Sequence, residues 1–334
     1  MALATPYLMF IGDAPDQLAA KVAIGVVHWR PEWCVGQLRM DGCKADLGIP
    51  DMTIEEAVAA GCKTLVVGVA NRGGIIPDSW KAVIVQAIEA GMDVASGLHQ
   101  KLTSIPAVAE AAKTHGRTLT DARHATREFD VASGQARTGR RLLTVGTDVS
   151  VGKMFTSLAI EREMKARGMN ADFRATGQTG IFIAGDGVSV DAVVADFIAG
   201  AAEWLTPANS ADHWDVVEGQ GSLFHASYSG VTLGLIHGSR PNALVLCHDA
   251  ARKEMRGTPG VPVPELENCI AVNERMAQMF EPDAKVVGVS VNTSSMDDVT
   301  AATYLSEISQ RLGLPAVDAV RTGVAPIVDA IEKL

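Results

Sequence analysis

The strongest constraint on the fold is a glycine-bounded loop between an apolar segment and a helical one. Residues 142–145 form a short apolar run, Gly146 and Gly152 bound the loop, and Lys153 opens a helical pattern over residues 153–167. Two glycines let the backbone fold around an anion, and the following helix points its positive end at that anion. The sequence therefore predicts a P-loop that binds a phosphorylated small molecule. The loop residues expected to hold this ligand are Gly146, Thr147, Asp148, Ser150, Val151, Gly152, Lys153 and Met154.

The loop departs from the usual Walker pattern in two ways. Five residues separate Gly146 from Gly152, where the usual loop has four. Met154 stands where a Ser or Thr hydroxyl normally holds Mg²⁺, and although Ser150 or Thr156 could replace it, Thr156 lies on a different face of the helix. Nucleotide hydrolysis therefore does not follow from the loop, and we expect no bound metal. We also expect the lysine of the loop to point to solvent when the site is empty.

Composition limits the class of protein and its partners. The 334 residues suffice for two domains, and a formal charge of −10 disfavours nucleic acid and anionic membranes, leaving a small molecule as the partner. No apolar run approaches the roughly 18 residues of a membrane span, and no signal peptide is recognisable at the start of the sequence. The five cysteines are scattered without a Cys-x-x-Cys pair, which argues against disulfides and zinc. We therefore expect a cytoplasmic protein.

Short apolar runs alternate with helical stretches along the whole chain, as in parallel α/β folds. The strands expected in the first part are residues 7–11, 63–69, 92–95 and 118–121, with a helix at 77–90. Those expected in the second part are 142–145, 171–175, 215–218, 243–247, 286–292 and 316–320, with a further helix at 297–312. No Gly-x-Gly-x-x-Gly follows the first strand, so dinucleotide binding is not supported. With a connection at 127–140, the sequence predicts a Rossmann-like domain over residues 1–135 and a P-loop NTPase-like parallel-sheet domain over residues 136–334.

Polar residues follow two of the expected strands. Glu218 closes one strand and is followed by Gly219-Gln220-Gly221, and a carboxylate at the carboxyl end of a parallel strand faces the ligand crevice. A turn at residues 177–180 follows another strand, so we expect Gln178 and Thr179 to bind substrate there.

Two of these features resemble a known group. The five-residue spacing resembles the Gly-Thr-Asp-x-x-Val-Gly-Lys loop of dethiobiotin synthetase and its relatives in cobalamin synthesis. The Glu-Gly-x-Gly at residues 218–221 resembles the strand end in that group whose glutamate helps to bind Mg²⁺. Asn292 occupies the position at which that group reads the nucleotide base, so the resemblance implies a cofactor contact there.

A second resemblance covers nearly the whole chain. Ala-Thr-Gly-Gln-Thr-Gly-Ile-Phe-Ile-Ala-Gly at 175–185 and Val-Asp-Ala-Val-Val-Ala-Asp-Phe-Ile-Ala-Gly-Ala-Ala-Glu-Trp at 190–204 are similar to the DgcN-type D-glutamate N-acetyltransferase family. That family has a small Rossmann-like domain followed by a P-loop domain. The resemblance implies acetyl transfer from acetyl-CoA to the amine of D-glutamate, within D-amino-acid catabolism.

Such a transfer needs a cradle for the CoA phosphates, a base for the substrate ammonium and donors for the thioester oxyanion. The P-loop supplies the cradle. The candidate bases are Glu218 first, then Asp191 and His225. An arginine fork matches a carboxylate, so the candidate substrate-binding arginines are Arg72, Arg174 and Arg240.

Two other functions remain open. The first is an ATP- and Mg²⁺-dependent ligase or kinase of the dethiobiotin synthetase kind, which Glu218 favours and Met154 disfavours. The second is a nucleotide-sensing or scaffold protein without turnover.

The pattern over residues 191–204 predicts a helix that is apolar around much of its circumference. Such a helix suits a core layer or a subunit contact, and we expect a homo-oligomer.

Overall fold

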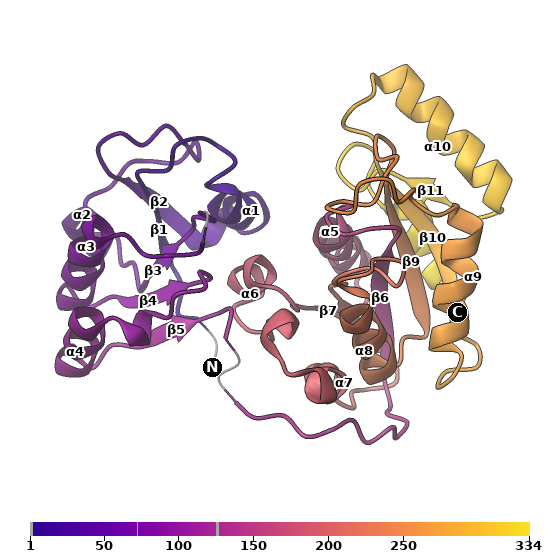
Figure 1. Ribbon diagram of the computed structural model, residues 1–334, viewed down its shortest axis with the longest axis horizontal. Helices are drawn as coiled ribbons and strands as arrows, with labels where there is room; N and C mark the ends of the chain where they lie inside the picture. The colour runs from indigo at the N-terminus through magenta and orange to yellow at the C-terminus, as the bar shows by residue number, and fades with distance from the viewer. Residues whose placement is uncertain (1–2, 72, 125–126) are drawn as a thin grey trace. The chain divides into compact units, whose positions relative to one another are not determined.

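The computed structural model describes residues 3–71, 73–124 and 127–334, and the chain forms two compact units. The first unit comprises Met1–Arg127 and Gly177–Ala192, and the second comprises Glu128–Thr176 and Val193–Leu334. The chain therefore passes between the units at three points, whereas the sequence predicts a single boundary between residues 135 and 136. Each unit is an α/β structure built on its own parallel sheet (Figure 1).

The first unit is a Rossmann-like sheet, as predicted. Its strands are β1 (Tyr7–Gly12), β2 (Cys34–Arg39), β3 (Thr64–Val67), β4 (Asp93–Ser96) and β5 (Leu119–Asp121). They lie in the order β2-β1-β3-β4-β5 and every pair is parallel. Its helices are α1 (Lys21–Trp29), α2 (Ile54–Ala59), α3 (Asp78–Glu89) and α4 (Pro106–His115), with short 3₁₀ turns at Pro31–Trp33 and Leu102–Ser104. In this order, right-handed crossovers leave α1 alone on one face and put α2, α3 and α4 on the other (Figure 1).

A helix from the middle of the sequence completes the face that α1 covers. Where the sequence predicts a turn at residues 177–180, the chain forms α6 (Gln178–Ala184), which packs against α1. Two contacts tie this segment to the first unit: the N–H of Leu3 donates to the carbonyl of Gly185 at 2.8 Å, and Arg123 pairs with Asp191 at 2.6 Å. The chain leaves the first unit after the 3₁₀ turn Val190–Ala192.

The second unit is built on a six-stranded parallel sheet. Its strands are β6 (Arg140–Gly146), β7 (Ala171–Arg174), β8 (Trp214–Val217), β9 (Ala243–Asp249), β10 (Lys285–Asn292) and β11 (Ala316–Val317), in the order β11-β10-β9-β6-β8-β7. Its helices are α5 (Lys153–Ala166), α7 (Ala195–Leu205), α8 (Ser229–Ser239), α9 (Leu266–Ala277), α10 (Asp298–Leu312) and α11 (Ala325–Ile331). α7, α8 and α9 pack side by side. α5 and α11 also pack against each other, α5 lying on β6, β7 and β8 and α11 lying on β10 and β11. The central strands are buried along nearly their whole length, as expected from their unbroken apolar sequence.

The apolar helix expected over residues 191–204 begins later, at Ala195, because Val194 has an extended backbone. α7 is in close contact with α8: a Cβ on Gly238 would stand 2.0 Å from the carbonyl oxygen of Ala199. Its opposite side exposes Phe197 and Trp204, so the helix is half-buried. Within the described part of the chain, no helix has both the length and the apolar character that crossing a membrane requires.

Candidate active site at the P-loop

The P-loop leaves the sheet at the end of β6, between β8 and β9, and enters α5 at Lys153. Gly146 has to be a glycine, because a Cβ there would lie 2.8 Å from both the Nζ of Lys153 and the carbonyl oxygen of Asp148. The loop then turns through left-handed backbone at Ser150 and Gly152, with φ of 53° and 98°. This backbone curls the loop around the start of the helix.

Lys153 is folded into the loop rather than extended into solvent. Its side chain is buried, and Nζ donates a hydrogen bond of 2.9 Å to the backbone carbonyl of Asp148. The expectation that this lysine points to solvent is therefore wrong, because the curled loop offers the ammonium an acceptor within its own backbone. Burial lowers the pKa of Lys153 to about 8, although the nearby charges of Asp148 and Glu218 oppose the shift.

Asp148 holds the loop in place. Its carboxylate is buried and accepts hydrogen bonds from the guanidinium of Arg252 at 2.9 Å and from the N–H of Arg256 at 2.7 Å. Burial alone would raise the pKa of Asp148, but the hydrogen bonds from Arg256, Arg252 and Val149 outweigh it, and the pKa lies below its ordinary value. The carboxylate is therefore an anchor for the loop and for the segment after β9.

His248 contacts the loop from the end of β9. Its Nδ1 lies 3.1 Å from the hydroxyl of Thr147, and the N–H of Thr147 donates to the carbonyl of Cys247. Burial lowers the pKa of His248, although the nearby carboxylate of Asp249 opposes the shift. His248, Arg252 and Arg256 were not among the predicted site residues. The signal in the sequence was their position just after the apolar run at residues 243–247.

Glu218 lies beside the P-loop, directly after β8, and is buried. One carboxylate oxygen accepts from the N–H of Thr176 at 3.0 Å, and the other accepts from the Nε2 of Gln220 at 3.2 Å. The next residue, Gly219, donates its N–H to the hydroxyl of Thr144, and a Cβ on Gly219 would stand 3.0 Å from the Cδ of Lys153. The structure therefore brings the strand end and the P-loop lysine together.

Thr156 is not available to replace the hydroxyl that Met154 lacks. Its hydroxyl is buried and donates to the Oγ of Ser290 on β10 at 2.8 Å. Met154 is partly exposed, and Ser150 is exposed at the turn of the loop.

A cavity of about 340 Å³ adjoins the P-loop on the β10 side. Asn292, at the end of β10, lines it, and its Oδ1 accepts from the N–H of Ser294 at 3.1 Å. The other lining residues are Val151, Gly152, Phe155, Thr156, Ser290, Val291, Ser294, Asp318, Ala319, Val320 and Arg321. Most of this lining is apolar, with polar groups at the strand ends, which is the character of a site for a flat heterocycle.

Family models for both halves match this chain. Residues 38–125 match the Rossmann-like domain and residues 130–328 match the P-loop domain of DUF1611, each described as a domain of unknown function. The chain belongs to the DUF1611 family.

Full-length relatives extend this result. The chain is 57% identical to a D-glutamate N-acetyltransferase of Tritonibacter scottomollicae over 98% of both chains. It is 48% identical to a D-glutamate N-acetyltransferase of a Pseudoalteromonas species, over 98% of this chain and 99% of the relative. A crystal structure of a DUF1611 family protein from Anabaena variabilis superposes with a TM-score of 0.86 at 33% identity, covering 99% of this chain and 100% of the other. This DUF1611 protein is an enzyme of the acyltransferase class.

Three predicted residues of the DUF1611 chain belong to the first unit rather than to the P-loop unit. Gln178 and Thr179 open α6, and the side chain of Gln178 packs against Gly97, which follows β4. Asp191 is half-exposed and pairs with Arg123. The structure therefore does not bring these residues together with Glu218 within one unit.

His225 is buried in the P-loop unit with both ring nitrogens engaged. Its Nε2 lies 2.9 Å from the carbonyl of Arg256, and its Nδ1 lies 3.1 Å from the N–H of Ser227. Because the carbonyl can only accept and the N–H can only donate, the ring is the neutral Nε2–H tautomer. Backbone contacts therefore engage both ring nitrogens, which leaves neither open to a substrate in this arrangement.

The two predicted arginines within the described residues, Arg174 and Arg240, do not converge on the P-loop. Arg174 ends β7, but its Nε donates to Asp215 at 2.6 Å. Arg240 precedes β9, at the amino edge of the sheet, and its guanidinium binds Glu281 and the carbonyl of Phe280. It is therefore at the wrong edge for the P-loop ligand. Arg72 lies outside the described residues.

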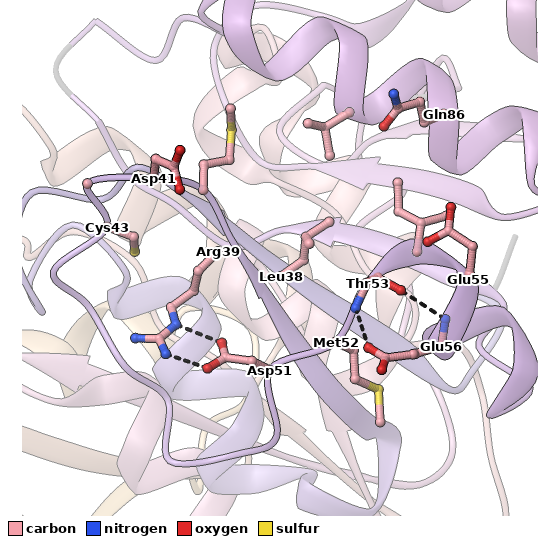
Figure 2. Close-up of a pocket in the computed structure, with 14 residues that line it drawn as sticks. Leu38, Arg39, Asp41, Cys43, Asp51, Met52, Thr53, Glu55, Glu56 and Gln86 are labelled. Carbon is pink, nitrogen blue, oxygen red and sulfur yellow. Dashed lines mark hydrogen bonds and ion pairs between the residues drawn. The ribbon is translucent and has the colours of Figure 1, made fainter.

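A larger cavity, of about 650 Å³, lies in the first unit between the end of β2, the start of α2 and the side chains of Val83 and Gln86 in α3 (Figure 2). Arg39 is its cation, but Asp51 already binds it in a fork, with Nε 2.7 Å from Oδ1. The other charged groups of the lining are Asp41, Glu55 and Glu56, and Glu56 forms a capping box with Thr53. This acidic lining does not suit a phosphate or a dicarboxylate.

Proposed function

We propose that this protein moves an acetyl group from acetyl-CoA to the amine of D-glutamate, in the cytoplasm and as a step of D-amino-acid catabolism. The observation that carries the proposal is the 57% identity, over 98% of both chains, to a relative named D-glutamate N-acetyltransferase. The geometry of the second unit supports it, because a P-loop and a buried carboxylate lie side by side at one edge of the sheet.

The P-loop is the proposed cradle for the phosphates of CoA. CoA carries an ADP moiety, whose pyrophosphate matches the loop amides and the N-terminus of α5. The ammonium of Lys153 lies within the loop and would exchange its bond to the Asp148 carbonyl for one to a phosphate oxygen. The 340 Å³ cavity beside Gly152 would take the adenine, with the amide of Asn292 reading its edge.

Glu218 is the proposed base. An amine attacks a thioester only after its ammonium has lost a proton, and Glu218 would accept that proton directly or through a water molecule. The amine nitrogen then bonds to the thioester carbonyl carbon and the C–S bond breaks. The proton held by Glu218 passes to the departing sulfur, which leaves as the CoA thiol, and the nitrogen loses its second proton to solvent as the amide forms. The hydrogen bonds from Thr176 and Gln220 hold the carboxylate in one orientation for this exchange.

The decisive experiment is incubation of the purified protein with acetyl-CoA and a panel of D- and L-amino acids, followed by mass spectrometry. We expect N-acetyl-D-glutamate and free CoA. Parallel incubations replace acetyl-CoA by ATP and Mg²⁺. A phosphorylated or ligated product in that arm alone would replace the acetyltransferase by a ligase or kinase, and binding without any product would indicate a sensor.

One observation favours the ligase or kinase as the second candidate. A carboxylate at the end of β8, next to the P-loop lysine, is where such enzymes place a Mg²⁺ ligand. Met154 and the engagement of Thr156 with Ser290 weigh against it.

We also propose that the protein acts as a homo-oligomer, which analytical ultracentrifugation checks.

A further inference from the structure

Arg256 has both of its backbone polar groups fixed by buried side chains. Its N–H donates to the carboxylate of Asp148 at 2.7 Å, and its carbonyl accepts from the Nε2 of His225 at 2.9 Å. Asp148 is 0% exposed and His225 is 3% exposed. The segment after β9 therefore passes against the P-loop at one defined residue.

The side chain of Arg256, in contrast, is exposed. Across the described ranges, its guanidinium takes part in no ion pair. Arg252, four residues earlier, behaves differently: it binds the carboxylates of Asp148 and Asp249 and the carbonyl of Val149. Arg252 is part of the scaffold, whereas Arg256 has its backbone fixed and its charge available.

Burying Asp148 and His225 costs free energy, and both side chains use a hydrogen bond to fix the backbone of Arg256. This indicates that the position of Arg256 matters. A buried carboxylate and a buried imidazole each lose hydration, and hydrogen bonds in the protein have to replace it. Here Asp148 accepts from the N–H of one exposed residue, Arg256, and His225 donates to the carbonyl of the same residue. Asp148 also accepts from the ammonium of Lys153 at its carbonyl and from Arg252 at its carboxylate, so three cationic residues are attached to the same loop residue.

We propose that Arg256 binds an oxyanion of the ligand at the P-loop, and that Asp148 and His225 are positioning residues that hold it there. The identity of the oxyanion rests on the proposed function: it is a phosphate of the acetyl donor or a carboxylate of the amino-acid substrate. His225, predicted from the sequence as a base, acts here through Arg256. A guanidinium suits either oxyanion because its fork binds two oxygens at once.

The first test compares Arg256→Ala with Arg275→Ala, a matched control that removes an exposed arginine from α9. We expect Arg256→Ala to raise the KM of one co-substrate about 10- to 100-fold, with kcat within about threefold of the wild type. A rise for acetyl-CoA, with a matching loss of CoA affinity in calorimetry, identifies the phosphate. A rise for D-glutamate identifies the carboxylate. If both KM values and the CoA affinity match those of Arg275→Ala, the inference is wrong.

The second test concerns His225. His225→Gln keeps a donor for the carbonyl of Arg256, and His225→Phe removes it. We expect His225→Phe to raise the KM of the same co-substrate and His225→Gln to restore most of it. In an Arg256→Ala background, His225→Phe should add less than about twofold, because the residue it positions is gone. Full additivity of the two changes would contradict the positioning role.

These outcomes separate this inference from the proposed function. If the wild type acetylates D-glutamate but Arg256→Ala behaves as the wild type, only the role of Arg256 fails. If the wild type binds CoA but does not acetylate D-glutamate, the proposed function fails, and the CoA affinity of Arg256→Ala still decides whether Arg256 binds the phosphate.

Discussion

The Nζ of Lys153 lies 2.9 Å from the carbonyl oxygen of Asp148, five residues earlier in the same P-loop. The lysine therefore occupies the interior of the loop that it is expected to complete. A phosphate that enters has to replace this carbonyl as the partner of the ammonium. Binding consequently couples the position of the lysine, the loop backbone and the anchor that Asp148 forms with Arg252 and Arg256.

Lys153→Met should weaken binding of the phosphorylated ligand by about 1.5–3 kcal/mol, the scale of a charge-assisted hydrogen bond. The fold should survive, because the variant removes a buried charge and keeps a side chain of similar length. Calorimetric titration with CoA and with ATP measures the change. Unchanged affinity for both ligands would rule out the P-loop as their binding site.

Ligand binding should also take up protons at alkaline pH. The pKa of Lys153 is about 8 without ligand, so the amine is mostly neutral at pH 9, and a bound phosphate raises that pKa by favouring the ammonium. We expect uptake of up to about one proton near pH 9 and little below pH 7, where both states are protonated. Calorimetry in buffers of different ionisation enthalpy measures the uptake. Lys153→Met should abolish it, and uptake that persists in this variant would assign the proton to another group.

Glu218→Gln should lower kcat by about 10²–10⁴, the usual contribution of a general base, with little change in CoA affinity. The amide keeps the shape of the side chain and can still accept from the N–H of Thr176, so the fold is preserved. Steady-state kinetics with D-glutamate tests the change. If the damage appears instead in ATP–Mg²⁺ affinity and added Mg²⁺ rescues it, Glu218 is a metal ligand of a ligase or kinase.

Excess EDTA should leave acetyl transfer largely intact. Met154 lacks a hydroxyl and that of Thr156 is bonded to Ser290, while attack on a thioester involves no γ-phosphate. The assay is the rate of CoA thiol release with and without EDTA. Loss of activity that Mg²⁺ restores would contradict the proposed metal-free mechanism.

Gly219→Ala should destabilise the second unit by about 1–3 kcal/mol or more, because its Cβ would stand 1.7 Å from the carbonyl oxygen of Thr144. The matched control is Gly230→Ala in α8, where no atom lies within 4 Å of the added carbon. That variant should gain about 0.5–1 kcal/mol from the lower entropy of its unfolded chain. Thermal unfolding of both variants measures the difference. Equal stability would show that β6 and the 218–221 segment are not in close contact.

The sequence predicts the two α/β units well because both depend on local patterns. Buried parallel strands are continuous apolar runs, and the P-loop has a glycine spacing that few other turns share. β2 was missed because Gly36 and Gln37 interrupt it and because it is a partly exposed edge strand. β11 is shorter than expected, since the carboxylate of Asp318 accepts from the N–H groups of Val320 and Arg321 and turns the chain there.

The site was less predictable because it depends on contacts between distant segments. A glycine spacing indicates where a phosphate loop lies, but not that Lys153 folds inward or that Asp148 faces away toward Arg252 and Arg256. The sequence makes His225 a candidate base because it follows the 218–221 segment. Only its distance to the carbonyl of Arg256, 31 residues later, shows the different contact.

The placement of α6 has a consequence for synthesis on the ribosome. The last segment of the first unit, Gly177–Ala192, is translated after the P-loop and three further elements of the second unit. When residue 127 leaves the exit tunnel, the face beside α1 is still uncovered, so the first unit cannot finish folding before its neighbour has begun. A fragment that stops at residue 127 should therefore be aggregation-prone. To express the first unit by itself, residues 177–192 have to be fused to the fragment that ends at residue 127.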